Sequence, residues 1–360
     1  MHKLMAGVTI LEHELSELRL LVERQAGILL DCPNSALAAH LAEYLETHEL
    51  DSTATLLERL SAADQDPSVL PAFLDGVLNV NTGFFRHPGA MNALAHCVIP
   101  QLYSRKSEDG PCALRIWSAG CSTGEEAYSI AMALCDVLPN GNGVGNGSNG
   151  ASNGAGPKEK TVTGRNGTAD SSAPTVAAPG TRDWSVHIVG SDLLASAIEV
   201  AERGLYPQSA LAGLPPATIR ACFTKIGNIG TGQNGAPDGN SNGAMNGASA
   251  VSINGSNGSA HLLVKPRLRS LVTFNTMNLI KPVYIGRFDC IFCMDVLPHL
   301  SRAQRTALLE RLHLYLEPGG YLFLSQTEKL CVSNLNFRSE SFDGYTFHRK
   351  PLAASAAYGR

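Results

Sequence analysis

The fold of this chain is decided by the stretch Leu114-Arg-Ile-Trp-Ser-Ala-Gly-Cys-Ser-Thr-Gly-Glu-Glu-Ala-Tyr128. It begins as an apolar strand, bends at a turn bounded by Gly120 and Gly124, and continues as a helix. This order is typical of a cofactor-binding strand, loop and helix. Both glycines can take backbone angles closed to other residues and let a ligand approach the main chain. Ser122 or Thr123 can cap the helix that follows.

Two acidic residues after the turn restrict the ligand. A loop that binds phosphate presents bare backbone N–H groups or a Lys to its anion. Glu125 and Glu126 place negative charge there instead. The loop therefore suits a cation or a ligand that carries hydroxyl groups, and a nucleoside triphosphate is disfavoured.

A further acidic residue is expected after the next strand, where it would bind the ribose of an adenosine-containing cofactor. Asp192 ends the strand pattern 186–192 and lies 72 residues after Gly120, a gap that shrinks to 30 once the foreign segment 140–181 is set aside. The alternative is that Asp192 only caps the helix that begins near Ala195, because an Asp before a helix is common.

The composition indicates a globular protein with one large domain or two. The chain has 360 residues, 44% of them hydrophobic, and contains no run of 18 apolar residues and no secretory signal. These features predict a cytoplasmic protein without membrane insertion. A formal net charge of −4 predicts no general affinity for nucleic acid or anionic membranes.

The cysteines favour a reducing compartment. Nine of them, an odd number, are scattered without the spacing of a disulfide framework. Cys290 and Cys293 form a C-x-x-C motif inside an apolar strand pattern, with no second pair to complete a zinc site. Buried core cysteines are therefore favoured over metal ligands, and no metal is expected.

The first 78 residues predict a small helical domain. Apolar residues recur at steps of three and four, and this pattern predicts helices over 10–30, 36–45, 53–60 and 70–80. A turn at Asn81–Arg86 and a further helix over 91–102 then lead to the cofactor strand.

Residues 79–350 are expected to form a second, larger domain, which two inserts interrupt. The segments 140–181 and 227–260 hold 19 of the 35 glycines and no Phe, Trp or Tyr, so they are expected to be flexible loops. Outside them, strands are expected at 114–118, 186–191, 271–277, 288–293 and 320–325, with helices near 125–138, 195–203 and 302–316. This alternation predicts an α/β fold, a doubly wound and mostly parallel sheet, and a hairpin over 337–348 adds an antiparallel edge.

Six sequence motifs, in the order in which they occur along the chain, resemble those of the CheR-type chemotaxis methyltransferases. This family methylates receptor glutamates with S-adenosylmethionine. The resemblance covers nearly everything outside the inserts. The turn at 81–86 resembles the family's T-x-F-F-R, and the loop at 117–131 resembles its C-S-T-G-E-E-P-Y-S-I-A. The other matching segments are 190–192, 201–206, 274–279 and 288–293.

This resemblance implies S-adenosylmethionine as cofactor and S-adenosylhomocysteine as product. Together with the loop analysis, it predicts that the cofactor-binding residues are Thr82, Arg86, Gly120, Gly124, Glu125, Glu126, Asp192, Asn278, Leu279, Met294 and Asp295. Asp192 would bind the ribose, and Asn278 and Leu279 would lie beside the adenine. Arg86 and His299 are the expected catalytic residues, and Arg86 would hold the carboxylate that accepts the methyl group. A surface or helix-capping Arg is the alternative for Arg86.

The chain departs from the family pattern at residues 294–300. The family has R-N-V-x-I-Y-F there, and this chain has Met294-Asp-Val-Leu-Pro-His-Leu300. Asp295 replaces an Asn that helps to hold the cofactor, and His299 replaces a Tyr near the transferred methyl. Ala127 also replaces the Pro of the E-E-P motif, with a mild loss of preorganisation.

The N-terminal region departs in charge. The receptor-modifying members present an arginine-rich helix, whereas residues 25–58 of this chain contain no Lys or Arg. Glu43, Glu46 and Glu49 would form an acidic face that repels an acidic substrate helix. The alternative is an ordinary solvated helix that happens to be acidic. Residues 222–270 resemble the place where the family inserts a small β subdomain, in which 261–269 would form an edge strand.

The leading functional hypothesis is a methyltransferase that acts on glutamate carboxylates of a chemoreceptor or related sensory protein. The alternative is a CheR-like regulatory or interaction module that binds the cofactor with weak or no methyl transfer, which the changes at 294–300 favour. A small-metabolite acceptor is a third, weaker option.

Overall fold

The structure is a computed structural model that describes residues 10–62, 69–78, 82–109, 113–138, 185–226, 260–281, 286–330 and 334–352. The insert expected at 140–181, nearly all of the one at 227–260, and Asn81 of the predicted turn lie outside these residues. Among the described helices, none is long and apolar enough to cross a membrane.

Four helices form the N-terminal part: α1 (Glu12–Ala26), α2 (Asn34–Thr47), α3 (Thr53–Ser61) and α4 (Val69–Val77). Their leucines form one apolar core, which also takes in Leu194 and Ala197 at the start of a later helix. The helix expected over 10–30 ends at Ala26, because Gly27 adopts a left-handed φ of 73° that closes it. Glu43 and Glu46 are exposed on α2, but Glu49 lies beyond its end.

The predicted helix over 91–102 has three parts, α5 (Pro88–Ala93), a π-helical turn (Leu94–Val98) and α6 (Ile99–Asp109). Pro100 lacks an N–H and its ring crowds the carbonyl four residues earlier, so regular α-helical hydrogen bonding cannot run through this position. The wider turn ends just before it.

The main sheet has seven strands in the order β6-β2-β1-β7-β8-β10-β9. The strands are β1 (Ala113–Ala119), β2 (Ser185–Asp192), β6 (Val272–Thr276), β7 (Phe288–Phe292), β8 (Leu316–Phe323), β9 (Arg338–Phe342) and β10 (Tyr345–Arg349). The first five in the order are parallel, and β10 and β9 pair antiparallel to their neighbours. This sheet, with its antiparallel edge, confirms the predicted fold class.

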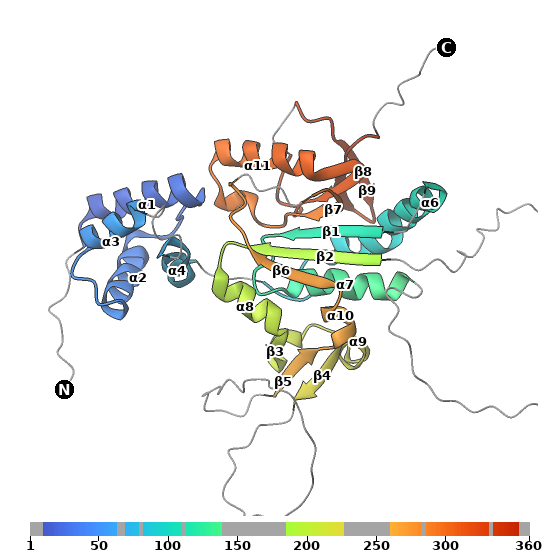
Figure 1. The fold of residues 1–360 in the computed structure, drawn as a ribbon, viewed down its shortest axis with the longest axis horizontal. Helices are drawn as coiled ribbons and strands as arrows, with labels where there is room; N and C mark the ends of the chain where they lie inside the picture. The colour runs from blue at the N-terminus through green and yellow to red at the C-terminus, as the bar shows by residue number, and fades with distance from the viewer. Residues whose placement is uncertain are drawn as a thin grey trace, which may run out of the picture.

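Helices cover both faces of the sheet because the strand side chains alternate. Leu114 and Ile116 of β1 pack in one core with α7 (Glu125–Val137). Trp117 and Ala119 pack in the opposite core with α11 (Arg302–Tyr315). In Figure 1, α7 and α11 lie on opposite sides of the sheet, and β1 and β2 point their carboxyl ends toward α1–α4.

Strand β8 begins four residues before its predicted start. Leu316 pairs with Phe288, and the register then shifts before Cys290 pairs with Tyr321. Gly319, with a φ of 76°, lies inside this bulge. The predicted strand at 320–325 therefore missed residues 316–319 of β8.

A second, three-stranded sheet lies beside the main one. Its order is β3-β5-β4, with β3 (Leu205–Pro207), β4 (Phe223–Ile226) and β5 (His261–Val264). It lies near α8 (Ala195–Arg203), α9 (Pro216–Cys222) and α10 (Pro266–Arg269) at one side of the molecule (Figure 1). The expected edge strand at 261–269 is wrong in one respect, because β5 is the central strand and pairs on both sides.

Candidate cofactor and acceptor site

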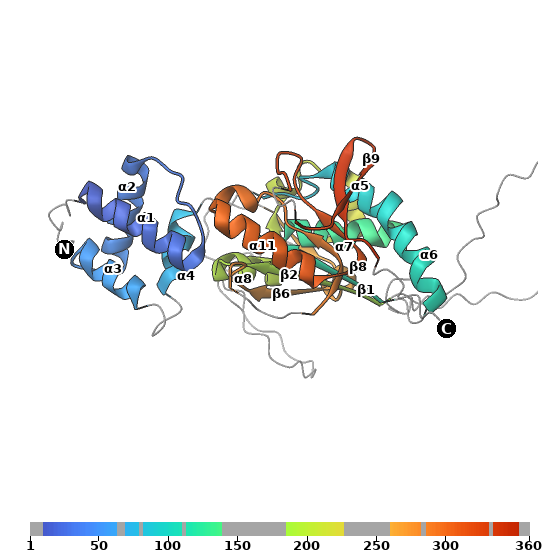
Figure 2. The same ribbon diagram turned by 90° about the horizontal axis from the view of Figure 1, so that it is seen from above.

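A cavity of about 660 Å³ opens at the carboxyl ends of the parallel strands. This is where α/β sheets bind their ligands, and the volume suits a cofactor-sized molecule. The segments that line it come from the N-terminal helices, the turn before α5, the loops after β1, β2 and β6, and residues 294–300. Seen from above, α1–α4 form a separate group of helices that lies against this end of the sheet (Figure 2).

The loop after β1 is shaped by two glycines with positive φ, 83° at Gly120 and 95° at Gly124. A Cβ on Gly120 would lie 2.5 Å from Val296, and one on Gly124 would lie 2.7 Å from the Cβ of Ala201. Gly120 belongs to the cavity wall, whereas Gly124 does not and packs against Ala201, so the expected approach of a ligand to these glycines stays a prediction. Neither expected cap is present, since the N-cap of α7 is Gly124 without a side-chain hydrogen bond.

Asp192 joins the loops after β1 and β2. Its Oδ2 accepts a hydrogen bond from the Ser122 N–H at 2.8 Å, and its Oδ1 accepts one from the Leu194 N–H at 3.0 Å. Burial raises the pKa of this carboxyl, while the backbone donors oppose the rise. The alternative of a local capping role thus holds in part, because the carboxylate accepts hydrogen bonds from the N–H groups of Ser122, Leu193 and Leu194, and one of its four lone pairs is left for a ligand.

Glu126 and Ser122 place polar atoms in the cavity wall. Burial raises the pKa of Glu126 to about 7, against a hydrogen bond of 2.6 Å from the Ser118 hydroxyl. The buried Ser122 Oγ has no hydrogen-bond partner among the described residues. A buried hydroxyl without a partner is costly. Both groups therefore suit a polar ligand.

Glu125 and Gly124 do not reach the cavity wall. Glu125 is buried, and its carboxylate accepts a hydrogen bond of 2.7 Å from Thr123 Oγ1 and another from Thr82. Ser129 on the next turn of α7 accepts the N–H of Phe85 at 2.9 Å. Glu125 and Ser129 thus fix the turn that carries Arg86, a structural role that the sequence analysis did not foresee.

Arg86 forms an ion pair inside the cavity wall. Its guanidinium lies 3.1 Å from Asp295 Oδ2, and the same oxygen lies 3.0 Å from His87 Nε2. The side chains of Arg86 and Asp295 are 40% and 29% exposed. The expected acceptor-binding residue therefore already contacts a carboxylate of its own chain. Sequence reasoning missed His87, although it directly follows the motif.

Glu328 holds the segment that carries Asp295. Its carboxylate accepts hydrogen bonds from the N–H groups of Asp295 (3.2 Å), Leu297 (2.9 Å) and Ser325 (2.8 Å). Asp295 itself has a φ of 56°. The sequence analysis missed Glu328, although the pattern Ser325-x-x-Glu328 after a strand is the signature of a capping box.

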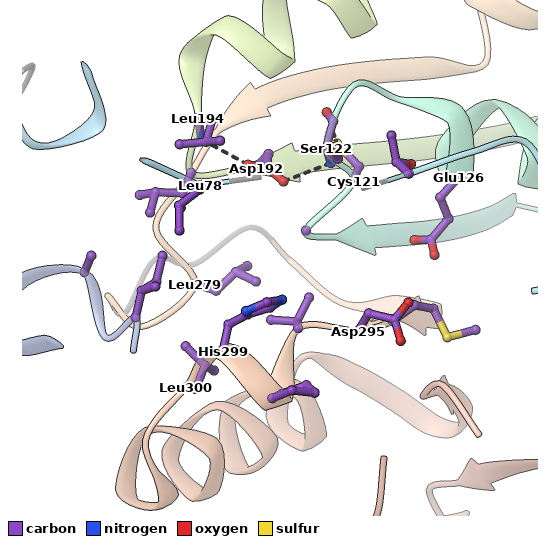
Figure 3. A pocket seen from close by; sticks show the side chains of 18 of the residues that line it. Leu78, Cys121, Ser122, Glu126, Asp192, Leu194, Leu279, Asp295, His299 and Leu300 are labelled. Atoms are coloured by element: carbon purple, nitrogen blue, oxygen red, sulfur yellow. Dashed lines mark hydrogen bonds between the residues drawn. The ribbon is translucent and has the colours of Figure 1, made fainter. Parts of the chain in front are cut away.

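The remaining predicted residues line the lower side of the cavity. Leu279, Met294 and His299 belong to its wall together with Asn278. Figure 3 shows the His299 ring projecting into the cavity between Leu279 and Asp295, opposite Asp192. The Asn278 side chain is engaged elsewhere, because its amide donates to the Gln25 carbonyl at 3.3 Å.

The N-terminal helices complete the cavity. Ala26, the last residue of α1, and residues 28–32 after it line the cavity directly. The Leu29 N–H donates to the His299 carbonyl at 2.7 Å, and Ile28 forms an isolated antiparallel bridge with Leu300. The sequence analysis did not place this segment in the site, although an apolar run after a helix-closing Gly was the available signal.

Known proteins resemble this chain over most of its length. Residues 80–146 and 249–345 match the family model described as "CheR methyltransferase, SAM binding domain". The chain is 27% identical over 315 residues to "Chemotaxis protein methyltransferase 1" of Pseudomonas aeruginosa, which covers 87% of this chain and 88% of that protein. It is 26% identical over 330 residues to "Chemotaxis protein methyltransferase 1" of Vibrio cholerae, with 91% and 92% covered.

Proposed function

The chain belongs to the CheR methyltransferase family, and from that premise we propose that it methylates glutamate side chains of a chemoreceptor or related sensory protein. The cofactor is S-adenosylmethionine. The observation that carries the proposal is that the loop after β1 and the carboxylate of Asp192 meet at one cavity, beside the buried Glu126.

The residues of the cavity fit this cofactor. Ser122 offers a buried hydroxyl that has no partner among the described residues, and the Asp192 carboxylate, which accepts three backbone hydrogen bonds, can accept one more from a ribose hydroxyl. Leu194 and Leu279 offer apolar surface for an adenine ring. Bound S-adenosylmethionine supplies a methyl group on a positively charged sulfur, and the Glu126 carboxylate is the buried anion that suits such a charge.

A glutamate acceptor needs no general base from this chain, because a glutamate carboxyl group ordinarily has a pKa of about 4.3 and is already ionised at neutral pH. The chain must instead hold the carboxylate, orient it and exclude water. We assign the holding role to Arg86, whose guanidinium can bind a carboxylate through two parallel hydrogen bonds. His299 projects into the same cavity and can donate a hydrogen bond near the reacting groups.

We propose that the acceptor protein contacts both parts of the molecule, the helices of residues 1–78 and the methyltransferase domain of residues 79–350. The support is that Ala26 and residues 28–32 form part of the cavity wall. The cytoplasmic location expected from the sequence stays a prediction.

The test is methyl transfer from tritiated S-adenosylmethionine to membranes that contain candidate receptors. A carboxyl ester is labile to base, so the transferred label should be released at high pH. Binding of S-adenosylhomocysteine by calorimetry checks the cofactor site separately. A tight cofactor site without base-labile label in any receptor preparation would contradict the proposed acceptor.

A further inference from the structure

The ion pair of Arg86 has a consequence for the choice of acceptor. Among the described residues that line the cavity, Arg86 is the one Arg or Lys. The Oδ2 atom of Asp295 lies 3.1 Å from the Arg86 guanidinium and 3.0 Å from His87 Nε2. The permanent positive charge that would attract an acceptor carboxylate is thus already paired with a carboxylate.

Asp295 is held in place by its backbone rather than by the ion pair alone. Its N–H is bound by Glu328, which also binds the Leu297 N–H two residues later. The Asp295 carboxylate lies 3.1 Å from the guanidinium and is tethered to the same chain. Its effective concentration at Arg86 is therefore about millimolar, and a free anion must reach a similar concentration to compete with it. A weak or freely diffusing carboxylate is therefore at a disadvantage.

We propose that Asp295 sets the concentration that an acceptor carboxylate must reach to bind: it occupies Arg86 in the resting enzyme and must release it when the acceptor glutamate arrives. The inference rests on the proposed function. Its consequence is that small dicarboxylates in solution leave Arg86 paired with Asp295, while a glutamate on a docked protein still binds, because further protein contacts raise its local concentration. Asp295 lowers affinity for every competing carboxylate alike, and only a docked protein compensates.

The test compares Asp295→Asn with wild type, using glutarate as a probe for the glutamate side chain. Asn tolerates a positive φ at least as well as Asp, so the turn should persist. Asp343→Asn is the matched control, since Asp343 is an aspartate with a similar positive φ, 49°, but it is exposed and lies outside the cavity wall. Glutarate is titrated by calorimetry into each protein, with and without saturating S-adenosylhomocysteine.

We expect Asp295→Asn to bind glutarate roughly two- to fivefold more tightly than wild type, the range for one partly exposed ion pair. Asp343→Asn should match wild type, and adding Arg86→Gln to Asp295→Asn should abolish the gain. In the transfer assay, the KM for the receptor acceptor should fall in Asp295→Asn by a similar factor.

Three results would overturn the inference. One is unchanged or weaker glutarate binding by Asp295→Asn, and the second is a gain that survives Arg86→Gln. The third is a loss of S-adenosylhomocysteine binding by Asp295→Asn, which would place Asp295 in the cofactor site. Failure of the proposed function gives a different pattern, namely no base-labile methyl transfer by either protein, while the glutarate titrations still decide the role of Asp295.

Discussion

The two ends of the cavity are built in different ways. At the cofactor end, backbone groups fix the geometry: the N–H groups of Ser122 and Leu194 hold Asp192, and Gly120 is packed against Val296. At the end that we assign to the acceptor, partly exposed side chains meet in the contact between Arg86 and Asp295. The first arrangement depends on the backbone conformation and tolerates few substitutions. The second depends on two side chains, so single substitutions can alter it without changing the backbone of the loop.

The largest effect that would test this contrast is expected from Gly124→Ala. The residue has a φ of 95°, and a Cβ would lie 3.1 Å from the Ala201 backbone. Positive φ and overpacking each cost about 1–3 kcal/mol, so we expect a loss of roughly 2–4 kcal/mol in the free energy of unfolding. Urea denaturation measures it. Gly213→Ala, at a site with no atom within 4 Å of the added Cβ, should change stability by less than about 0.5 kcal/mol.

The next effect concerns the acceptor end and should leave stability intact. Arg86→Ala should lower kcat/KM for the receptor acceptor by roughly ten- to a hundredfold, because a hydrogen bond to a charged group contributes about 1.5–3 kcal/mol. Binding of S-adenosylhomocysteine should stay close to wild type. Steady-state transfer kinetics and calorimetry measure the two quantities, and equal turnover in the variant would remove Arg86 from the mechanism.

Binding of the cofactor should depend on pH through Glu126. Burial raises the pKa of Glu126 to about 7, so the carboxyl is mostly protonated at pH 6 and mostly ionised at pH 8. Because a positively charged sulfur favours the ionised form, S-adenosylmethionine should bind about tenfold more weakly at pH 6 than at pH 8. S-adenosylhomocysteine lacks that charge and should change less, and Glu126→Gln should remove the difference between the two ligands. Identical pH profiles for both ligands would contradict this placement of Glu126.

The smallest effect is expected far from the cavity. Glu43 and Glu46 are exposed on α2, so the double change of both to Lys should affect only long-range attraction of an acidic acceptor. We expect kcat/KM to rise by about two- to fivefold at low salt and the gain to disappear at high ionic strength. A gain that persists in high salt would indicate a direct contact instead.

The sequence predicted the fold well because periodicity and loop residues are local signals. The five parallel strands, α7, α8 and α11 and the closing hairpin all lie within a few residues of the expected positions. Two predicted element boundaries were wrong. Gly27 ends α1 earlier than predicted, and β8 begins earlier than predicted, at Leu316, because the strand continues through a bulge.

The site was predicted less completely. Motif positions identified most residues of the cavity wall, but they could not tell Glu126, which faces it, from Glu125, which supports the turn of Arg86. Neighbours on a helix differ by about 100° in direction, and a resemblance does not state which faces the ligand. Contacts between distant segments, such as Glu328 with Asp295, depend on the tertiary fold and escape local patterns.

The hydrogen bond from Leu29 to the His299 carbonyl runs from main chain to main chain. Side-chain replacement at either position leaves both atoms in place, and only a proline at position 29 would delete the donor. Substitutions on the surface of α1–α4 can therefore change its charge while this backbone hydrogen bond to the methyltransferase domain is kept.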